Sequence, residues 1–292
     1  MKFEQLALIG CGLMGGSFAL AMRRAGLVKR VVGYSKSPST TERARQLGVI
    51  DVEAPSALLA VSGADIVLLA VPVAATESTF KAIRHLVRQD MLLMDVGSTK
   101  RDVVEAGRRA LREQIGAFVP CHPIAGKEHG GIEHADADLY AGRQVVITPI
   151  ERTLVAQLAQ AEQVWKQLGS RVVKMSPEAH DATYAAVSHL PHMLAFAYMN
   201  GLMDQAQAAR FMALAGSGFR DFSRIAASEP AVWRDILLAN RQELLAQSRH
   251  FREALAQFER SVEAGDAKAV EELVRRARAA RAPWRMGTGL ED

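Results

Sequence analysis

The chain has 292 residues, of which 49% are hydrophobic and 23% charged, a composition that excludes disordered and fibrous proteins. It carries 36 lysines and arginines against 32 aspartates and glutamates, a net charge of +4. This small excess suits anionic small ligands but does not indicate a nucleic-acid partner. Four glycines interrupt the apolar stretch 6–22, so no membrane span is predicted and a cytoplasmic location is expected.

Short β-rich runs alternate with helical patterns through the first half of the chain. Strands are expected at 6–9, 31–34, 66–71 and 91–96, with helices at 13–26 and 39–47 and weaker strands at 118–119 and 145–147. The runs 66–71 and 91–96 are apolar almost throughout, which is typical of parallel strands covered on both faces. The alternation predicts an α/β fold with a Rossmann-type doubly wound sheet.

The pattern changes after about Pro149, where helical spacing replaces strand signals except for a strand at 171–175. Phe251, Leu255, Phe258 and Val262, for example, recur at the spacing of one helix face. We therefore expect a dinucleotide-binding domain at residues 1–170. An all-helical substrate and dimerisation domain is expected at residues 171–292.

A glycine-rich loop follows the first expected strand and opens a helix, which is the context of the dinucleotide fingerprint. Gly10 permits the tight turn, Gly12 lets the backbone approach a pyrophosphate, and Gly15 allows close packing of helix on strand. The helix N-terminus would offer N–H groups to the phosphates. Leu13 and Met14 lie inside this loop and are predicted cofactor-binding residues with the three glycines.

The choice of cofactor depends on the residue about 20 positions beyond the last glycine, where an acid would bind the ribose 2′-hydroxyl of NAD. This chain has Ser35, Lys36 and Ser37 there, so no carboxylate would repel a 2′-phosphate. NADP is expected, with NAD possible. Val71 and Pro72, at the end of the strand 66–71, complete the predicted cofactor residues.

Two segments supply candidate catalytic residues. Ser98, after the strand 91–96, would either bond near a nicotinamide or cap the next helix. His122 is expected just after another strand end, held by Pro123, with Gly126 leaving space beside it. A histidine can serve as an acid–base group near neutral pH, although a packed or capping histidine is the alternative.

The second half adds histidines and arginines. His189 and His192 lie three residues apart and share a helix face, but no third ligand is suitably spaced, so no metal is expected. The segment 216–224 supplies Arg220 and Arg224, whose planar guanidinium groups suit carboxylates. One of the two arginines could instead pair with a nearby aspartate.

With these motifs in order, the chain resembles the prephenate/arogenate (cyclohexadienyl) dehydrogenase family of tyrosine biosynthesis. The matching segments are 10–16, 95–100, 122–128, 187–192, and 218–224 continuing to 233–235. The resemblance implies oxidative decarboxylation of prephenate or L-arogenate with hydride transfer to NADP or NAD. It also implies a homodimer built by the helical domain.

The resemblance assigns roles to residues of this chain. His122 would accept the substrate's hydroxyl proton, Ser98 would help to hold the hydroxyl and the histidine, and Arg224 would bind a substrate carboxylate. The other residues expected in the substrate pocket are His189, His192, Glu128 and Lys127.

Three points stay open at this stage. A β-hydroxyacid dehydrogenase would need a lysine in the helix around 177–200, and that stretch has none. A non-catalytic NADP-binding sensor would have little need for the catalytic and carboxylate-binding residues together. Prephenate and arogenate are not distinguished, because Glu128 would favour an ammonium group and Lys127 would oppose it.

Overall fold

A parallel sheet forms the core of the first domain in the computed structural model, which describes residues 2–127 and 129–285. Its strands are β1 (Phe3–Ile9), β2 (Val28–Tyr34), β3 (Val52–Glu53), β4 (Ile66–Leu69), β5 (Leu92–Asp95) and β6 (Phe118–Val119). All neighbours pair in parallel in the order β3-β2-β1-β4-β5-β6. This is the doubly wound order, so the predicted fold class is confirmed.

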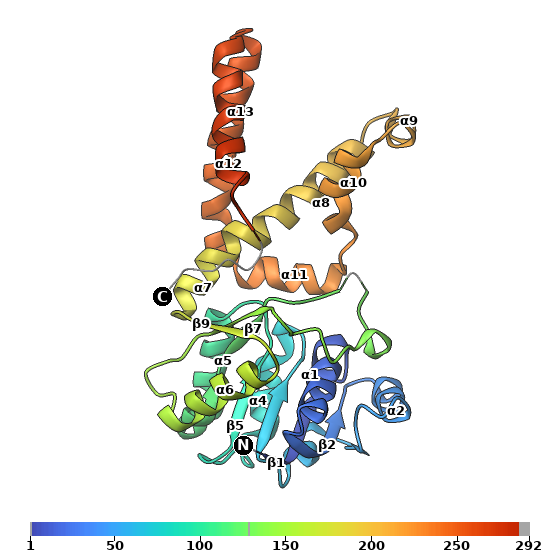
Figure 1. Ribbon diagram of the computed structural model, residues 1–292, viewed down its shortest axis with the longest axis vertical. Helices are drawn as coiled ribbons and strands as arrows, with labels where there is room; N and C mark the ends of the chain where they lie inside the picture. The colour runs from blue at the N-terminus through green and yellow to red at the C-terminus, as the bar shows by residue number, and fades with distance from the viewer. Residues whose placement is uncertain (1, 128, 286–292) are drawn as a thin grey trace.

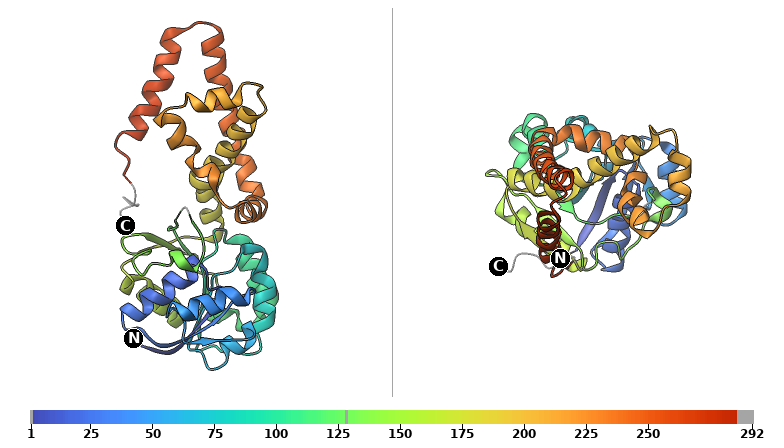
Figure 2. Two further views of the ribbon diagram at one scale, coloured as in Figure 1. Left: turned by 90° about the vertical axis from the view of Figure 1, so that its right-hand side faces the viewer. Right: turned by 90° about the horizontal axis from the view of Figure 1, so that it is seen from above.

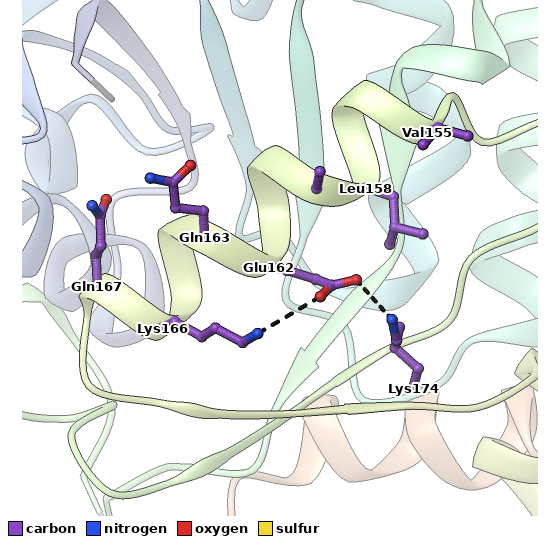
Figure 3. Close-up of a pocket in the computed structure, with 8 residues that line it drawn as sticks. Val155, Leu158, Glu162, Gln163, Lys166, Gln167 and Lys174 are labelled. Atoms are coloured by element: carbon purple, nitrogen blue, oxygen red, sulfur yellow. Dashed lines mark hydrogen bonds and ion pairs between the residues drawn. The ribbon is translucent and has the colours of Figure 1, made fainter.

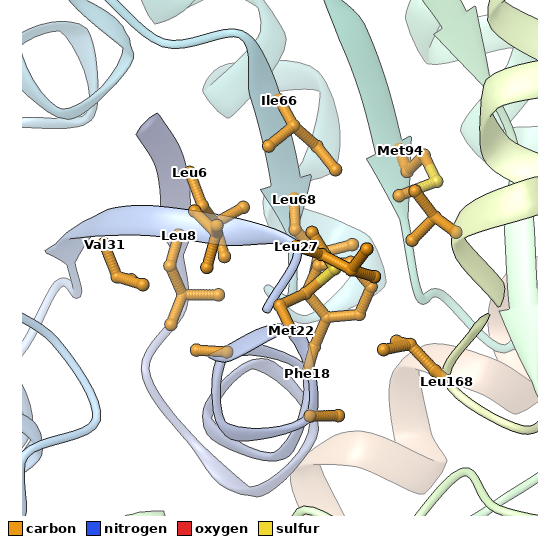
Figure 4. Packing of buried hydrophobic residues seen from close by; sticks show 14 of the residues in the cluster. Leu6, Leu8, Phe18, Met22, Leu27, Val31, Ile66, Leu68, Met94 and Leu168 are labelled. Atoms are coloured by element: carbon orange, nitrogen blue, oxygen red, sulfur yellow. The ribbon is translucent and has the colours of Figure 1, made fainter. Parts of the chain in front are cut away.

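Helices cover both faces of this sheet (Figure 1). They are α1 (Leu13–Arg24), α2 (Pro38–Gln46), α3 (Ala57–Val61), α4 (Thr76–Ile83), α5 (Arg101–Leu111) and α6 (Val155–Gln167). Leu6 and Leu8 of β1 pack on the side of α1, where Phe18 and Met22 meet them (Figure 4). The alternate β1 residues pack on the other face, with α3, α4 and α5. The two-residue alternation of a strand thus supplies both cores.

A second, three-stranded sheet contains β7 (Cys121–Pro123), β8 (Gln144–Ile147) and β9 (Arg171–Lys174). β7 pairs antiparallel with β8, and β8 pairs in parallel with β9. His122 follows the end of β6 at Val119, as expected, but it also lies inside the short strand β7, which the sequence did not predict. Because β9 completes this sheet, we propose that the domain boundary lies at 174/175, four residues after the expected one.

The described residues after β9 are mainly helical. Their elements are α7 (Pro177–Tyr184), a π-helical segment (Ala185–His189), α8 (Leu190–Met203), α9 (Ala208–Ala213), α10 (Ser217–Ser223), α11 (Pro230–Ala239), α12 (Arg241–Glu263) and α13 (Ala267–Arg281). α7 and α11 lie nearest the sheet domain, while α12 and α13 project away from it (Figures 1 and 2). Within the described residues, no helix combines the length and apolar character that crossing a bilayer requires.

Candidate active site

The glycine loop between β1 and α1 has the geometry of a phosphate cradle. Gly10 has φ +98°, and a Cβ there would lie 2.1 Å from the Ala70 carbonyl oxygen. A Cβ on Gly15 would lie 2.1 Å from the Gly10 carbonyl oxygen, so both positions require glycine. Gly12, at the N-cap of α1, has nothing within 4 Å of a Cβ position. The open side of the loop is thus at Gly12, beside the N–H groups of the first helical turn.

A cavity of about 960 Å³ opens beside this loop and extends to the helical domain. It lies at the carboxyl ends of β1 and β4, the switch point where doubly wound sheets bind ligands. Of the predicted site residues, it is lined by Gly12, Leu13, Met14, Val71, Pro72, Ser98, Lys127, His192 and Arg224. Glu128 lies outside the described residues. One cavity therefore brings together predicted cofactor and substrate residues.

The predicted ribose-binding residues lie at the end of β2. The Cys11 N–H donates to the Ser35 hydroxyl oxygen at 2.8 Å, so Ser35 braces the glycine loop. Ser37 precedes α2, and its hydroxyl lies 2.8 Å from that of Ser39. Lys36 is exposed beside them. These residues are not among the described ones that line the large cavity.

His122 belongs to a buried polar chain. Its Nδ1 lies 2.8 Å from Nε2 of His180, and Nδ1 of His180 lies 2.8 Å from Oδ1 of Asp181. His180 and Asp181 are almost fully buried, and the ring of Tyr184 packs 4.9 Å from that of His122. Burial, followed by electrostatic interactions with His180, Lys100 and His189, holds the pKa of His122 well below its usual value. His122 is therefore neutral at pH 7 and able to accept a proton.

Asp181 also caps helix α5. Its Oδ1 accepts the N–H of Lys100 at 2.8 Å, and its Oδ2 accepts that of Arg101 at 3.0 Å. The N-cap position is occupied by Lys100, so Ser98 does not cap this helix. Ser98 lines the cavity.

A buried ion pair fixes the backbone beside His122. The ammonium of Lys100, which has no exposed surface, lies 2.5 Å from Oδ2 of Asp95 and donates to the Cys121 carbonyl at 2.9 Å. Oδ1 of Asp95 accepts the Cys121 N–H at 3.0 Å, and Oδ2 accepts the Gly97 N–H at 2.8 Å. The ends of β5 and β7 are therefore tied together at the residue that precedes His122.

The two histidines of the helical domain have different surroundings. His189 is buried, and its Nδ1 lies 3.0 Å from the amide nitrogen of Asn240. His192 stacks on Trp233 with ring centroids 3.6 Å apart, and its Nδ1 lies 2.9 Å from the Ser188 carbonyl oxygen. Only His192 and Trp233 of this group line the cavity among the described residues. Within residues 2–127 and 129–285, no group of three or more ligating side chains is placed to hold a metal.

The cationic residues of the cavity differ in their partners. Arg220 and Arg224 both line it, and Nε of Arg220 pairs with Asp221 at 2.9 Å. The ammonium of Lys127 lies 3.0 Å from both Asp136 and the His134 carbonyl oxygen. Lys127 thus lines the cavity while its charge is already compensated.

Sequence reasoning missed His180, Asp181 and Asn240, although all three are buried next to predicted residues. The adjacent His-Asp pair at the start of a helix was a usable signal, because buried positions rarely hold such groups unless they are paired. Asn240, between α11 and α12, gave none. Its amide donates to the Asp181 carbonyl at 2.8 Å, a contact 59 positions away in the sequence.

A second hollow lies on the outer face of α6, near β9 (Figure 3). Glu162 projects into it and pairs with Lys174 at 3.0 Å and Lys166 at 3.8 Å. Its charges are mutually compensated, and it is lined by α6 and Lys174 alone. The candidate active site is therefore the cavity at the glycine loop.

Models of two family domains match the chain. The nucleotide-binding domain of prephenate dehydrogenase matches residues 18–174, and the dimerization domain of prephenate dehydrogenase matches residues 176–277. The cyclohexadienyl dehydrogenase of Zymomonas mobilis is 36% identical over 85% of both chains. The prephenate dehydrogenase of Bacillus subtilis is 35% identical over 83% of this chain and 66% of its own length.

Solved structures agree with this assignment. The prephenate dehydrogenase of A. aeolicus, in complex with hydroxyphenyl propionate and NAD+, has a TM-score of 0.91 at 32% identity and covers 97% of this chain and 98% of its own. A Mycobacterium tuberculosis 3-hydroxyisobutyrate dehydrogenase, over 99% of this chain and 98% of its own, has a TM-score of 0.52 at 15% identity, a likeness of fold alone. The chain belongs to the prephenate dehydrogenase family and is an oxidoreductase.

Proposed function

We propose that this enzyme catalyses the oxidative decarboxylation of prephenate, L-arogenate or both, in tyrosine biosynthesis. The observation that carries this proposal is a neutral histidine, His122, held by buried partners in a family member with an intact dinucleotide cradle. Relatives named for each substrate support it, since the similar proteins include a prephenate dehydrogenase and the arogenate dehydrogenase of Synechocystis. The latter structure is 27% identical, covers 95% of this chain and 99% of its own, and has a TM-score of 0.81.

The cradle fits a nicotinamide dinucleotide. The open space at Gly12 and the N-terminus of α1 suit a pyrophosphate, and Leu13, Met14, Val71 and Pro72 extend the same wall of the cavity. When bound, the cofactor supplies a hydride acceptor. The protein's task is then to orient the substrate and to manage one proton.

His122 manages that proton. It takes the proton of the hydroxyl on the ring carbon that loses hydride, so that a carbonyl forms there. The bond to the ring carboxylate then breaks, CO₂ leaves, and the electron pair of that bond makes the ring aromatic. The proton returns from His122 to the phenolic oxygen. General-base assistance of this kind typically contributes about 10²–10⁴-fold to the rate.

Two polar residues that line the cavity are assigned to binding the substrate. Ser98 would hold the hydroxyl, and Arg224 would bind a carboxylate through its planar guanidinium. His189, His192 and Lys127 are assigned to the surrounding pocket, as is Glu128, which lies outside the described residues. The pairing of Lys127 with Asp136 supports a lesser role for Lys127 in binding the substrate.

We propose NADP as the preferred cofactor, with NAD also accepted. No carboxylate follows β2 where a 2′-phosphate would lie, and Ser35, Lys36 and Ser37 offer two hydroxyls and a cation. The NAD+ in the A. aeolicus structure supports a nicotinamide dinucleotide without deciding between the two.

We also propose a homodimer formed by the helical domain. Several of its apolar side chains are more than half exposed, among them Leu238 and Val262 at 64% each. The match to a dimerization domain over residues 176–277 supports a second copy of the chain as the partner that covers them.

The test is the formation of reduced nicotinamide, followed by absorbance, with prephenate and L-arogenate each combined with NADP+ and NAD+. Turnover with either substrate is expected, and the ratios of kcat/KM would order substrates and cofactors. Folded enzyme that binds the cofactor yet turns over none of the four combinations would contradict the proposal and leave a non-catalytic sensor.

A further inference from the structure

A line of hydrogen bonds runs from the proposed base into the protein interior. It links His122 on β7 to His180 on α7, and His180 to Asp181, which is anchored on the first turn of α5. Three separate elements therefore meet around one imidazole. None of these three residues lines the cavity among the described residues, but His122 is partly exposed while His180 and Asp181 are buried, so the influence of these two on a substrate acts through His122.

We infer that His180 and Asp181 are positioning residues that hold His122 in the tautomer whose Nε2 carries no proton. Their role in catalysis rests on the proposed function, whereas the tautomer itself does not. A neutral imidazole has one protonated nitrogen and one bare nitrogen, and only the bare one can accept a proton. The hydrogen-bond partner of Nδ1 decides which is which.

Both carboxyl oxygens of Asp181 face backbone donors. The Lys100 N–H points at Oδ1 and the Arg101 N–H at Oδ2, and both belong to the positive end of helix α5. A proton on either oxygen would compete with one of these N–H groups. Burial raises the pKa of Asp181, whereas the two backbone N–H groups and the nearby Lys100 ammonium act against that shift, so the contacts of its two oxygens are those of a carboxylate.

An ionised Asp181 fixes both rings in turn. Its Oδ1 can only accept, so Nδ1 of His180 carries a proton and donates to it. His180 is neutral, since burial lowers its pKa to about 2, and its Nε2 is therefore bare. That bare nitrogen accepts from Nδ1–H of His122, across 2.8 Å. Nε2 of His122 is left as a lone pair, as a general base requires.

The opposite arrangement is disfavoured by the same contacts. If Asp181 were protonated and donated to Nδ1 of His180, the donor and acceptor would be exchanged in both hydrogen bonds of the line. Nε2–H of His180 would then donate to Nδ1 of His122, and Nε2 of His122 would carry a proton and lose its basicity. Oδ1 of Asp181 would also have to donate while facing the Lys100 N–H.

The same line stabilises His122 after it accepts a proton. The imidazolium then donates through Nδ1–H to His180, and His180 donates to the Asp181 carboxylate. The positive charge on His122 is thus linked to a negative charge through two hydrogen bonds. The other titratable side chains beside this cluster are Tyr184, His189, the paired Lys100, and Asp102, which faces Asp181 as a like charge. None of them replaces His180 as the partner of Nδ1 in the described residues.

The first experiment measures the tautomer directly. Full-length protein labelled with [¹⁵N]histidine is observed by NMR at pH 7.5 without substrate, because a bare and a protonated ring nitrogen resonate far apart. His122→Gln assigns the signals among the 8 histidines. We expect a bare Nε2 on His122 and a protonated Nδ1. A protonated Nε2 would overturn the inference, even in an active enzyme.

The second experiment measures kinetics. His180→Phe removes the acceptor for Nδ1–H of His122. It should lower kcat by about 10²-fold or more, which approaches the effect of removing a general base. KM should change less than about twofold. In His180→Gln the amide oxygen can still accept from Nδ1–H of His122. The kcat of this variant should therefore be at least about tenfold higher than that of His180→Phe. His85→Gln, an exposed histidine beyond α4, serves as the matched control with unchanged kcat.

The outcomes separate the two proposals. A bare Nε2 in an enzyme that is inactive with all four substrate and cofactor pairs would overturn the proposed function and keep the tautomer. An active wild type whose His180→Phe variant folds and keeps its kcat would overturn the positioning role. If His180→Phe does not fold, the NMR result decides the tautomer, and the kcat of His180→Gln decides the positioning role. That kcat must exceed one tenth of the wild-type value for the role to stand.

Discussion

At the scale of single residues, the site uses buried histidines that stay neutral. Burial lowers the pKa of His180 to about 2 and of His189 to about 4, and that of His122 falls well below its usual value. Each of them can therefore act as a hydrogen-bond acceptor at physiological pH. His192 is less deeply buried and stacks on Trp233, so the wall of the cavity is held by packing.

His122→Asn should lose most of the turnover and still bind substrate. The amide retains some polar character but cannot take a proton, so kcat should fall about 10²–10⁴-fold while KM changes little. Steady-state kinetics with the better substrate and cofactor pair checks this. A near-normal kcat would remove His122 from the role of base, and His250→Asn on the exposed face of α12 is the control.

Arg224→Ala should act on binding. If Arg224 holds a substrate carboxylate in both the ground state and the transition state, KM should rise by about tenfold or more with a smaller effect on kcat. Arg220→Ala is the matched comparison, because it removes another guanidinium from the wall of the same cavity. Equal effects of the two substitutions on KM would contradict the assignment of Arg224.

The buried histidines also make stability depend on pH. His180 has a folded pKa of about 2 and an ordinary value near 6.5 when unfolded, so the unfolded chain binds an extra proton between these values. Stability is therefore fully present above pH 6.5 and falls as pH drops, by about 1.4 kcal/mol per pH unit for this group. Urea unfolding at pH 7, 6 and 5 should show a smaller loss for His180→Gln than for wild type. Equal losses would contradict this reasoning.

At the scale of elements, the glycine loop needs Gly12 for cofactor binding and Gly15 for stability. Gly12→Ala should leave the thermal midpoint nearly unchanged, because its Cβ meets nothing within 4 Å, and should raise the Kd for cofactor at least about tenfold. Gly15→Ala should lower stability markedly, since its Cβ would lie 2.1 Å from a carbonyl oxygen. Differential scanning fluorimetry and cofactor titration test both, and a destabilised Gly12→Ala would refute the distinction.

Local pattern explains which elements could be predicted. The apolar runs at β4 and β5 and the glycine loop before α1 depend on neighbours in sequence, so their places were correct. β7 is three residues long and pairs antiparallel with a strand more than 20 positions away, so nothing local distinguished it from a loop. The π-helical segment Ala185–His189 likewise has no periodicity of its own that would separate it from an α-helix.

The capping of α5 shows the same limit. Helix caps are normally sought one to three residues before a helix, which pointed to Ser98. The carboxylate that bonds the first turn comes instead from Asp181, 81 positions from Lys100. Contacts of this kind depend on how the second domain docks on the first, and one sequence carries little information about that.

At the scale of the whole molecule, the helical domain should join two chains. Gel filtration with light scattering should give about twice the monomer mass of 31.7 kDa. Leu238→Arg combined with Val262→Arg should shift the protein towards monomer, because each places a charge where an apolar side chain is 64% exposed in one chain. Leu59→Arg on α3 of the first domain, 54% exposed, is the control. A double variant that stays dimeric would place the interface elsewhere.

The line from Asp181 to His122 has a consequence for biosynthesis of the enzyme itself. A ribosome releases the cofactor-binding half first, and α7, which supplies His180 and Asp181, only afterwards. The emerging chain can thus acquire its dinucleotide cradle before the histidine on β7 has the partners that define its protonation. The protonation of His122 is therefore set only once α7 has docked on α5, after every residue of the glycine loop has emerged.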